Sequence, residues 1–340
     1  MIRRGEELIG VAPFYLGWVK GAKAGAPVRL RLVGAGQGGS LLELPQVLAA
    51  PQHDRDVLRP VVAETIKLVP GRGGADWTEV AIPAAQGWFE PEWSYSTGEP
   101  VAFHRAQVAR ASVVLPLAHD WESTRSSLKR KLKESLRRPR NRLAKDGRTQ
   151  AVVARTHDLD EGAVDTFLAL HRQRSRHDAA VVHGDAYTKP ALSEFMRDAL
   201  PRLGRRGRAT LLELLFRDRV VAVQLALFAP GVTYLHSSGL DPEARTMGPV
   251  TFLQEQLVKQ AAERGDRWVN FSPGPNVEKL RWSEQLDYDF TYGSGGGSLR
   301  WKYGNFAAVQ TLKQVMHAVA VARENRAPAR AEQPPGRDDG

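Results

Sequence analysis

A short apolar strand that ends at a Pro-Gly turn restricts most strongly how this chain can fold. Residues 267–271 form the expected strand, and Pro273-Gly274 end it. Upstream, a polar loop at 239–242 precedes a helix that opens near Gly248-Pro249, where proline suits the first helical turn. A strand, a loop, a helix and a second strand in this order predict an α/β domain, in which two neighbouring strands are joined by a helix.

The segments on either side extend this prediction to a mixed sheet. Residues 208–239 predict an antiparallel meander of three strands, with turns at Asp218 and at Pro230-Gly231. Asp158 is the expected N-cap of one helix, and Pro190 is the expected first residue of the next. Residues 84–108 are expected to be irregular. The other expected strands are 7–15, 27–33, 76–82, 110–116, 150–154, 288–292 and 298–303. The expected helices are 54–69, 120–146, 158–171, 191–203, 252–262 and 305–323.

The expected helix 120–146 holds most of the chain's net charge of +10. Eleven Lys or Arg residues lie between Arg125 and Arg148, against two acidic residues, which is a net charge of about +9. Leucines recur every four residues as an apolar ridge, and Pro139 is expected to kink or end the helix. The charged face is either a solvated surface or a platform for a polyanion. The residues selected for polyanion contact are Lys129, Arg130, Lys133 and Arg137.

Contacts at this basic helix are expected to involve phosphates, since no aromatic residues are interleaved for base stacking. A tRNA acceptor stem, a nucleotide-linked sugar precursor and a lipid phosphate all fit that chemistry. Elsewhere the chain contains no cysteine, which excludes a thiolate nucleophile and Cys-based metal sites. We expect no metal site, no membrane-spanning helix and no signal peptide, and therefore a cytoplasmic protein.

The strand and turn are followed by Lys279 and Trp282, spaced as Gly-x4-Lys-x2-Trp from Gly274. Together with the preceding strand, loop and helix, this spacing resembles the C-terminal half of GNAT-like acyltransferases of the CelD/BcsL (BioF2-like) family, relatives of FemAB ligases. The resemblance covers about residues 105–305, and 5–85 more weakly. It implies an α/β (α+β) GNAT-like fold, with a mixed central sheet flanked by helices.

The same resemblance implies a division into domains. Similar proteins usually carry two GNAT-like units, so residues 1–104 are expected to form a partial, truncated N-terminal unit. Residues 105–323 are expected to form the catalytic unit, including the basic helix 120–146. The composition of residues 324–340 predicts a disordered tail.

The function that the resemblance implies is transfer of an acyl group, first of all acetyl from acetyl-CoA or another acyl-CoA, to a small-molecule amine. The amine would attack directly, without a covalent enzyme intermediate. One alternative is a FemAB-like ligase that depends on aminoacyl-tRNA, which the basic helix favours. Another is a non-catalytic accessory protein in polysaccharide or cell-envelope biosynthesis. The oligomeric state stays open.

The resemblance assigns catalytic roles to few side chains. Lys279 is expected to sit over the carbonyl oxygen or a substrate phosphate. Asn270 stands where many relatives have aspartate; it can orient a partner but cannot act as a general base. His236 is a candidate replacement base, because its ordinary pKa near 6.5 suits proton transfer. Asp241 is a candidate base or a turn-forming residue. Trp282 is expected to be a pocket wall or a core anchor.

The donor loop of ordinary acetyltransferases corresponds here to residues 244–249, with Arg245 and a single glycine, Gly248. This stretch is either a phosphate-binding turn or a plain helix cap. His171-Arg172, expected at a helix end, either faces an anionic substrate or complements the helix dipole. The residues selected for substrate or donor binding are Tyr234, Arg245, Gly248, Asn270, Phe271, Gly274, Trp282 and Arg172.

Overall fold

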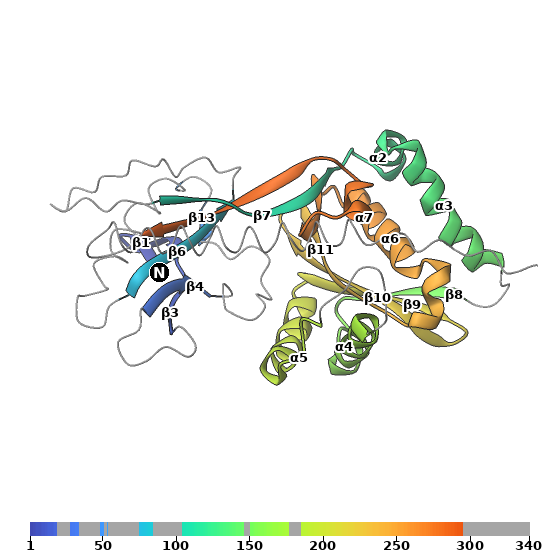
Figure 1. Cartoon of the computed structure of the whole chain (residues 1–340), viewed down its shortest axis with the longest axis horizontal. Helices are drawn as coiled ribbons and strands as arrows, with labels where there is room; N and C mark the ends of the chain where they lie inside the picture. Colours follow the sequence, from blue (N-terminus) through green and yellow to red (C-terminus); the bar gives the residue numbers. More distant parts are fainter. Residues whose placement is uncertain are drawn as a thin grey trace, which may run out of the picture.

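The computed structural model describes residues 1–18, 28–33, 48–50, 53, 75–83, 104–145, 150–176 and 185–294. Within them lies a large mixed sheet (Figure 1). Its strands are β3 (Phe14–Trp18), β4 (Val28–Leu32), β6 (Ala75–Pro83), β7 (His104–Pro116), β8 (Gln150–Arg155), β9 (Ala209–Phe216), β10 (Arg219–Ala229), β11 (Val232–Leu240), β12 (Trp268–Pro273) and β13 (Leu286–Ser294). Their order is β3-β4-β6-β13-β7-β12-β11-β10-β9-β8. A smaller sheet contains β1 (Ile2–Arg4), β2 (Glu7–Val11) and β5 (Leu48–Ala49).

Helices cover both faces of the part of the large sheet that contains β9, β10 and β11 (Figure 1). One face is covered by α4 (Glu161–Arg176) and α5 (Pro190–Arg205). The opposite face is covered by α6 (Pro249–Glu263), and α2 (Trp121–Ser127) and α3 (Arg130–Lys145) pack on α6. Two short helices, η3 (Pro242–Met247) and α7 (Val277–Leu280), flank α6 and β12 in the chain. The predicted α/β fold with a mixed central sheet flanked by helices is confirmed.

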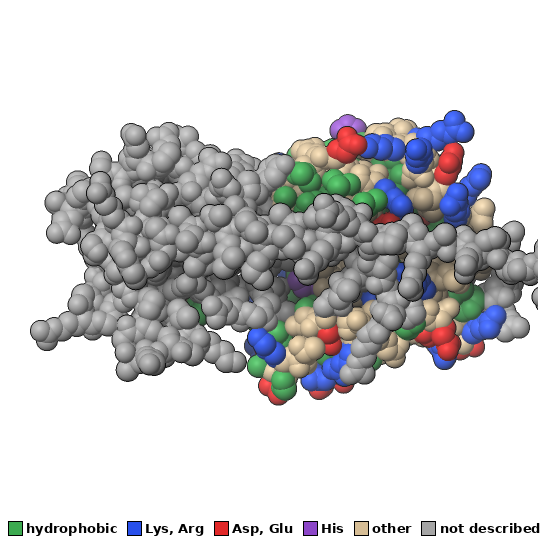
Figure 2. Space-filling view, in the orientation of Figure 1, with side chains coloured by type: hydrophobic (Ala, Val, Ile, Leu, Met, Phe, Trp, Pro, Cys, Tyr) green, Lys and Arg blue, Asp and Glu red, His purple; other side chains and the backbone are tan. Residues whose placement is uncertain are grey.

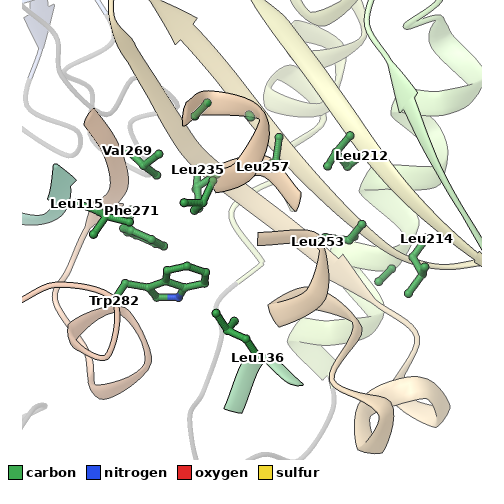
Figure 3. Packing of buried hydrophobic residues seen from close by; sticks show 14 of the residues in the cluster. Leu115, Leu136, Leu212, Leu214, Leu235, Leu253, Leu257, Val269, Phe271 and Trp282 are labelled. Carbon is green, nitrogen blue, oxygen red and sulfur yellow. The ribbon is translucent and has the colours of Figure 1, made fainter. Parts of the chain in front are cut away.

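Strand β9 supplies apolar side chains to both cores. Leu211 packs with the cluster beneath α4 and α5, whereas Leu212 and Leu214 pack with the cluster beneath α6 (Figure 3). All three side chains are fully buried. A strand covered on both faces is mostly apolar, and residues 211–216 accordingly include one charged residue, Glu213, whose buried carboxylate pairs with Arg155.

The predicted meander is confirmed as β9, β10 and β11, with antiparallel pairing throughout. Arg217 and Asp218 form the first turn with positive φ values of 54° and 60°, the geometry of a tight two-residue hairpin. Gly231, with φ 73°, forms the second turn. Both turns match the sequence-based expectation.

The predicted strand 7–15 is wrong as a single element, because the chain breaks at Pro13. The N–H of Phe14 donates to the carbonyl of Ala12 at 2.9 Å, and the carbonyl of Pro13 accepts from Val33 at 2.7 Å. Proline cannot donate to a sheet ladder, so a strand through this position would lose a hydrogen bond. The chain instead changes sheets here, with β2 in the small sheet and β3 in the large one.

The predicted helix 120–146 is two helices. Asp120 caps the first, since its Oδ1 accepts from the N–H of Ser123 at 2.8 Å. Leu128 then adopts an extended conformation with ψ 145°, which ends α2 and buries the leucine. The expectation that Pro139 ends the helix is wrong, because α3 continues to Lys145.

Two further helix ends differ from the expectation. Asp160, not Asp158, caps α4, and its Oδ1 accepts from the N–H of Ala163 at 2.8 Å. Asp158 accepts instead from the N–H of Thr156 at 3.1 Å, so its carboxylate stabilises the turn that precedes α4. Helix α4 also extends to Arg176, which places His171 inside the helix. Pro190 is confirmed as the first residue of α5.

Strand β7 begins at His104, within the region that was expected to be irregular. It pairs with β12 on one side and with β13 on the other, and β13 also pairs with β6. Strands β3, β4 and β6, which precede residue 104, therefore continue the same sheet, and the division at 104–105 stays a prediction. The expected elements 54–69, 298–303 and 305–323, and the tail 324–340, lie outside the described residues.

Candidate active site

Strands β11 and β12 run side by side and then separate. Their parallel pairing joins Val232 to Trp268, Thr233 to Val269 and Tyr234 to Asn270, where the register ends. Strand β11 nevertheless continues to Leu240 beside β10, and β12 continues to Pro273. We call the space beyond Tyr234 and Asn270, between the two diverging strands, the strand gap. Beyond this point, backbone groups that regular parallel pairing would have satisfied need other partners.

Ser272 gives β12 its bend at the strand gap. This residue has a positive φ of 67°, which is uncommon for a residue with a side chain. The side-chain oxygen of Asn270 accepts from the N–H of Ser272 at 2.8 Å, and the hydroxyl of Ser272 donates to the carbonyl of Leu235 across the gap. Asn270 is 3% exposed. This predicted site residue therefore shapes the backbone at the end of β12.

Lys279 reaches back from α7 to the same strand end. Its Nζ lies 3.0 Å from the carbonyl oxygens of both Ser272 and Pro273. Asn276 caps α7 by accepting from the N–H of Lys279 at 2.9 Å, and this hydrogen bond fixes the backbone position of the lysine. The ammonium group therefore lies where β12 leaves the sheet, and Gly274, with φ 86°, makes the turn between them.

Trp282 is part of the core beside this lysine. The indole is 5% exposed, and its ring centroid lies 5.3 Å from that of Phe271 (Figure 3). Leu136 of α3 and Leu235 of β11 belong to the same buried cluster. Of the two roles predicted for Trp282, these contacts correspond to the core anchor.

The segment between β11 and α6 holds the predicted donor loop. Gly248 has φ 70°, and a Cβ added there would lie 2.9 Å from Cγ of Pro139 on α3. Arg142 of α3 donates to the carbonyl of Thr246. Arg245 is exposed, and no hydrogen bond or ion pair joins its side chain to another described residue. The basic helix therefore packs directly against the loop that opens α6.

Asp241 and His236 lie at different places on β11. Asp241 caps η3 by accepting from the N–H of Glu243 at 3.0 Å, and it pairs with Arg219 at 2.8 Å. These contacts correspond to the predicted turn-forming role. His236 is the extra residue of a β-bulge, because Leu225 pairs with Ser237 and Ala226 with Leu235. His236 is partly buried, as is Tyr234.

On the α4 side of β11, a second group of polar side chains meets the strand end. We call it the α4–β11 cluster. His171 Nδ1 lies 3.0 Å from the carbonyl oxygen of Ser238, and Tyr187 donates to the hydroxyl of Ser237 at 3.1 Å. Asp185 Oδ2 lies 3.6 Å from Nε of the predicted residue Arg172. The α4–β11 cluster consists of His171, Arg174, Asp185, Tyr187, Ser237 and Ser238.

Sequence reasoning missed Asp185 and Tyr187. Asp185 accepts from the N–H of Tyr187 at 3.0 Å, a local turn that precedes α5. Tyr187 is 2% exposed and its ring packs edge-on against His171, with the centroids 4.8 Å apart. An Asp-x-Tyr sequence before a helix is a common turn, so its position against β11 depends on tertiary packing. It carries no local signal of a site.

A cavity of about 410 Å³ opens elsewhere, beside Phe228 and Gly231 at the start of β11. Its lining includes none of the predicted site residues. Within it, Arg264 stacks over the Phe228 ring at 4.1 Å and pairs with Asp266 at 2.6 Å. The charge of Arg264 is thereby balanced by Asp266.

Four residues were selected on the basic helix for polyanion contact. Three of them contact groups on the protein itself: Lys129 pairs with Glu284, Arg130 with Glu134, and Lys133 donates to the carbonyl of Ser126. Arg137 is exposed, as are Lys131 and Arg138, and no interaction joins these three to other described side chains. Figure 2 shows Lys and Arg side chains gathered over the α2–α3 region at the upper right.

The described residues also bear on metal binding and membrane insertion. No group of three or more His, Cys, Asp or Glu residues among them is arranged to hold a metal ion. None of the helices in that part of the chain combines the length and the apolar composition that a bilayer crossing requires.

Comparison with known proteins identifies the type of domain. Residues 130–280 match the model of an acetyltransferase (GNAT) domain. The fold is similar to the crystal structure of FemX, with a TM-score of 0.57 and 13% identity over 85% of this chain and 86% of that one. It is also similar to L-PGS from Bacillus licheniformis, with a TM-score of 0.51 and 10% identity over 85% and 86% of the two chains. No curated protein matches the sequence. The chain therefore contains a GNAT-type acyltransferase domain.

Proposed function

We propose that this protein is an N-acyltransferase that moves an acyl group, first of all acetyl from acetyl-CoA, to the amine of a small molecule. Within the GNAT-type proteins we assign it to the CelD/BcsL group. The observation that carries the proposal is the strand gap, where parallel pairing ends at Tyr234 and Asn270. An extended acyl chain between the strands can bond to backbone groups that pairing leaves unsatisfied. The GNAT-domain match over 130–280 supports the same reaction class.

The start of α6 fits the phosphate groups of such a donor. This helix is 15 residues long, so its first amide groups and its dipole favour an anion at the N-terminus. Arg245, which is exposed on the preceding turn, adds a full positive charge. Gly248, with its left-handed conformation, is the residue at the junction between this turn and α6. We assign donor binding to these residues, with Tyr234, Phe271 and Gly274 along the acyl chain.

The reaction in this proposal is a direct transfer. The amine nitrogen attacks the acyl carbon, a C–N bond forms, and the bond between that carbon and the donor's sulfur breaks. Lys279 supplies positive charge near the oxyanion and holds the end of β12 through the carbonyls of Ser272 and Pro273. His236 stays a candidate proton acceptor. Asp241 is assigned to the η3 turn, because Arg219 and the N–H of Glu243 already occupy its carboxylate.

Thermal unfolding with acetyl-CoA, free CoA and bulk tRNA, at about 50 and 200 mM salt, tests this function. Stabilisation by acetyl-CoA or CoA at both salt concentrations is the expected result. It should be followed by release of free CoA when an amine acceptor is added. An unchanged melting temperature with every compound would contradict the proposal and favour a non-catalytic accessory protein in cell-envelope biosynthesis.

The second candidate is an aminoacyl-tRNA-dependent ligase of the FemAB type. The specific observation in its favour is the exposed face of α3, with Lys131, Arg137 and Arg138 available to phosphates. This helix also contacts the donor loop through Arg142 and Pro139. A nucleic acid on α3 would therefore lie next to the start of α6. Stabilisation by tRNA that fades as salt increases, without any effect of CoA, would select this candidate.

A further inference from the structure

The cavity beside Phe228 lies before the start of β11 and β12, whereas the strand gap lies beyond Tyr234 and Asn270. Its walls come from the ends of β8 and β10, the start of β9, the β10–β11 turn and the last turn of α6. At about 410 Å³ it falls within the size range of small-molecule sites. We call it the α6 cavity, and its lining includes Thr156, Arg208, Thr210, Phe228, Gln260 and Arg264.

Arg208 brings an unbalanced positive charge to the α6 cavity. Its backbone is held in place, because its N–H donates to the carbonyl of Leu203 at 2.8 Å and its carbonyl accepts from the N–H of Phe228 at 2.8 Å. Its side chain is exposed, and no hydrogen bond or ion pair joins it to another described residue. The other charged residues of the lining, Arg264 and Asp266, pair with each other. Two arginines against one aspartate leave the lining with a net charge of +1.

Arg264 is held so that part of its guanidinium can still donate. Its Nε lies 3.4 Å from one carboxylate oxygen of Asp266, and its Nη2 lies 2.6 Å from the other and also contacts the hydroxyl of Thr233. The guanidinium stacks over the Phe228 ring at 4.1 Å, which fixes its orientation. Nη1 has no hydrogen-bond partner among the described residues. Arg264 can therefore keep its contacts with Asp266 and donate to a ligand as well.

The carbonyl end of α6 borders the same cavity, and the dipole of a helix disfavours an anion at this end. Here the carbonyls of the last turn are already paired with the backbone N–H groups that follow the helix. Those of Gln260, Ala261 and Ala262 each accept at 3.0 Å. Arg264 adds a positive charge at this helix end. The negative end of the helix is thus weakened as an obstacle to anion binding.

Neutral polar groups line another part of the cavity. Gln260 is partly buried and its side chain has no partner among the described residues, so its amide offers both a donor and an acceptor. Thr210 donates to the carbonyl of Arg155 at 3.1 Å, and its hydroxyl oxygen lies 2.8 Å from that of Thr156. The hydroxyl of Thr156 therefore donates to Thr210 and keeps a lone pair for a ligand. These groups match the hydroxyl groups of a sugar, which both donate and accept.

We propose that the α6 cavity binds a small organic anion that also carries hydroxyl groups, either a sugar phosphate or a sugar acid. Arg208 and Nη1 of Arg264 bind the phosphate or carboxylate, since guanidinium groups bind both through paired N–H donors. Gln260 and Thr156 bind the hydroxyl groups. None of the described residues that line this cavity belongs to the strand gap or to the donor loop. The site is therefore separate from the proposed acyl transfer and does not depend on it.

Isothermal titration calorimetry of the whole protein measures this binding directly. The probes are glucose 6-phosphate and gluconate, and they are compared with inorganic phosphate, acetate and glucose, each of which carries only part of their chemistry. We expect at least one of the two hexose anions to bind with a Kd about ten-fold or more below those of its parts. The hexose anion that binds more tightly shows whether the site prefers phosphate or carboxylate. Binding of both hexose anions no tighter than that of their parts would overturn the inference.

Variants then locate the bound anion. Arg208→Gln should weaken binding of the hexose anion about 10- to 100-fold, because a charged donor is lost. Arg206→Gln is the matched control, since this exposed arginine lies on the same loop but outside the lining, and it should bind as the wild type does. Gln260→Leu should weaken binding of the hexose anion about 2- to 10-fold and leave that of the inorganic anion or acetate unchanged. Unaltered binding in Arg208→Gln, or equal losses in Arg206→Gln and Arg208→Gln, would overturn the inference.

Arg245→Gln distinguishes the two ends of α6. Arg245 lies on the turn before this helix, where we place the acyl donor, so its removal should leave binding of the hexose anion unchanged. A loss of binding in Arg245→Gln as large as that in Arg208→Gln would place the anion at the start of α6 and overturn the inference. Failure of acetyl-CoA to bind or react would count against the proposed function alone, because the hexose anion is titrated without it.

Discussion

The side-chain oxygen of Asn270 accepts a hydrogen bond from the backbone N–H of Ser272, 2.8 Å away, and so stabilises a positive φ at the end of β12. The resemblance places an aspartate at this position in many relatives. Here the side-chain amide of Asn270 bonds to the backbone of the same strand. It places the carbonyls of Ser272 and Pro273 where Lys279 binds them. The bend of β12, the lysine and the strand gap are therefore parts of one arrangement.

A double-mutant cycle measures the link between Asn270 and Ser272. Asn270→Ala should lower the free energy of unfolding by about 1–3 kcal/mol, because a buried N–H loses its acceptor. The loss should be smaller in a Ser272→Gly background, since glycine adopts positive φ without assistance. Urea denaturation of the four proteins gives the coupling energy. Strictly additive losses would mean that the hydrogen bond does not support the bend.

Gly248→Ala tests the contact between α3 and the start of α6. The substitution forces φ 70° on alanine and brings its Cβ to 2.9 Å from Pro139. Gly207→Ala is a matched control, with φ 63° and nothing within 4 Å of the added carbon. We expect a loss of about 1 kcal/mol in the control and a larger loss at Gly248. Equal shifts of the urea midpoint in the two variants would show that α3 moves to accommodate the added methyl group.

Lys279→Met should remove the cation from the strand end. We expect a loss of stability of about 1–2 kcal/mol, because two carbonyls lose a charged donor. Acetyl-CoA-dependent turnover should fall about 100-fold or more, as for loss of an oxyanion donor. Lys259→Met, on the exposed side of α6, is the control. Turnover equal to that of the control, measured by CoA release, would assign Lys279 a purely structural role.

Glu255 should make stability depend on pH. Its side chain is 2% exposed on α6, one oxygen pairs with Arg140, and the other has no partner among the described residues. Burial raises the pKa of Glu255 although Arg140 opposes it. Because its folded-state pKa is raised, Glu255 stabilises the folded state most at pH values below the ordinary pKa of glutamate. This contribution is lost as the pH rises through the pKa of the folded state.

Glu255→Gln removes this titration. Its free energy of unfolding, relative to the wild type, should therefore increase as pH rises from about 4 to 8. Urea denaturation at several pH values measures the difference. Glu263→Gln, at the exposed end of the same helix, controls for removal of a surface charge. A difference that is independent of pH would contradict the prediction.

Charge reversal on α3 tests polyanion binding. Arg137→Glu with Arg138→Glu should weaken tRNA binding about uniformly and reduce its salt slope, because fewer counterions are released. The matched control is Arg205→Glu with Arg206→Glu, two exposed neighbouring arginines at the end of α5 on the opposite face of the sheet. Affinity for tRNA is measured by filter binding at several salt concentrations. Equal losses of affinity in the two double variants would mean that only the net charge of the protein matters.

Local sequence patterns predicted the elements of the fold well. Pro190 opens α5 as expected, and the turns at Asp218 and Gly231 separate the meander strands. The errors occur where the local sequence allows a residue two different structural roles. Both Asp158 and Asp160 can cap a helix, and Leu128 could have continued α2. Burial of the leucine and the turn at Thr156 decide these cases, and neither is visible in a local window.

The candidate site was harder to predict than the fold. Lys279 and Asn270 were selected because a short segment, Asn270 to Trp282, resembles the motif of a known family. His171, Asp185 and Tyr187 meet Ser237 and Ser238 only through the packing of α4 on β11, between residues about 50 to 67 positions apart. The glycine that permits this packing, Gly239, resembles any strand-end glycine in the sequence.

Strand β7 has a further consequence for β12, which it flanks on the side away from β11. Positions from Ser112 to Pro116 of β7 pair with β12, although more than 150 residues separate the two strands in the chain. If β7 were detached, β12 would become an open edge, with a row of N–H and C=O groups able to capture a strand of another molecule. A strand of the candidate site is thus protected from edge-to-edge association by a segment remote from it in the chain.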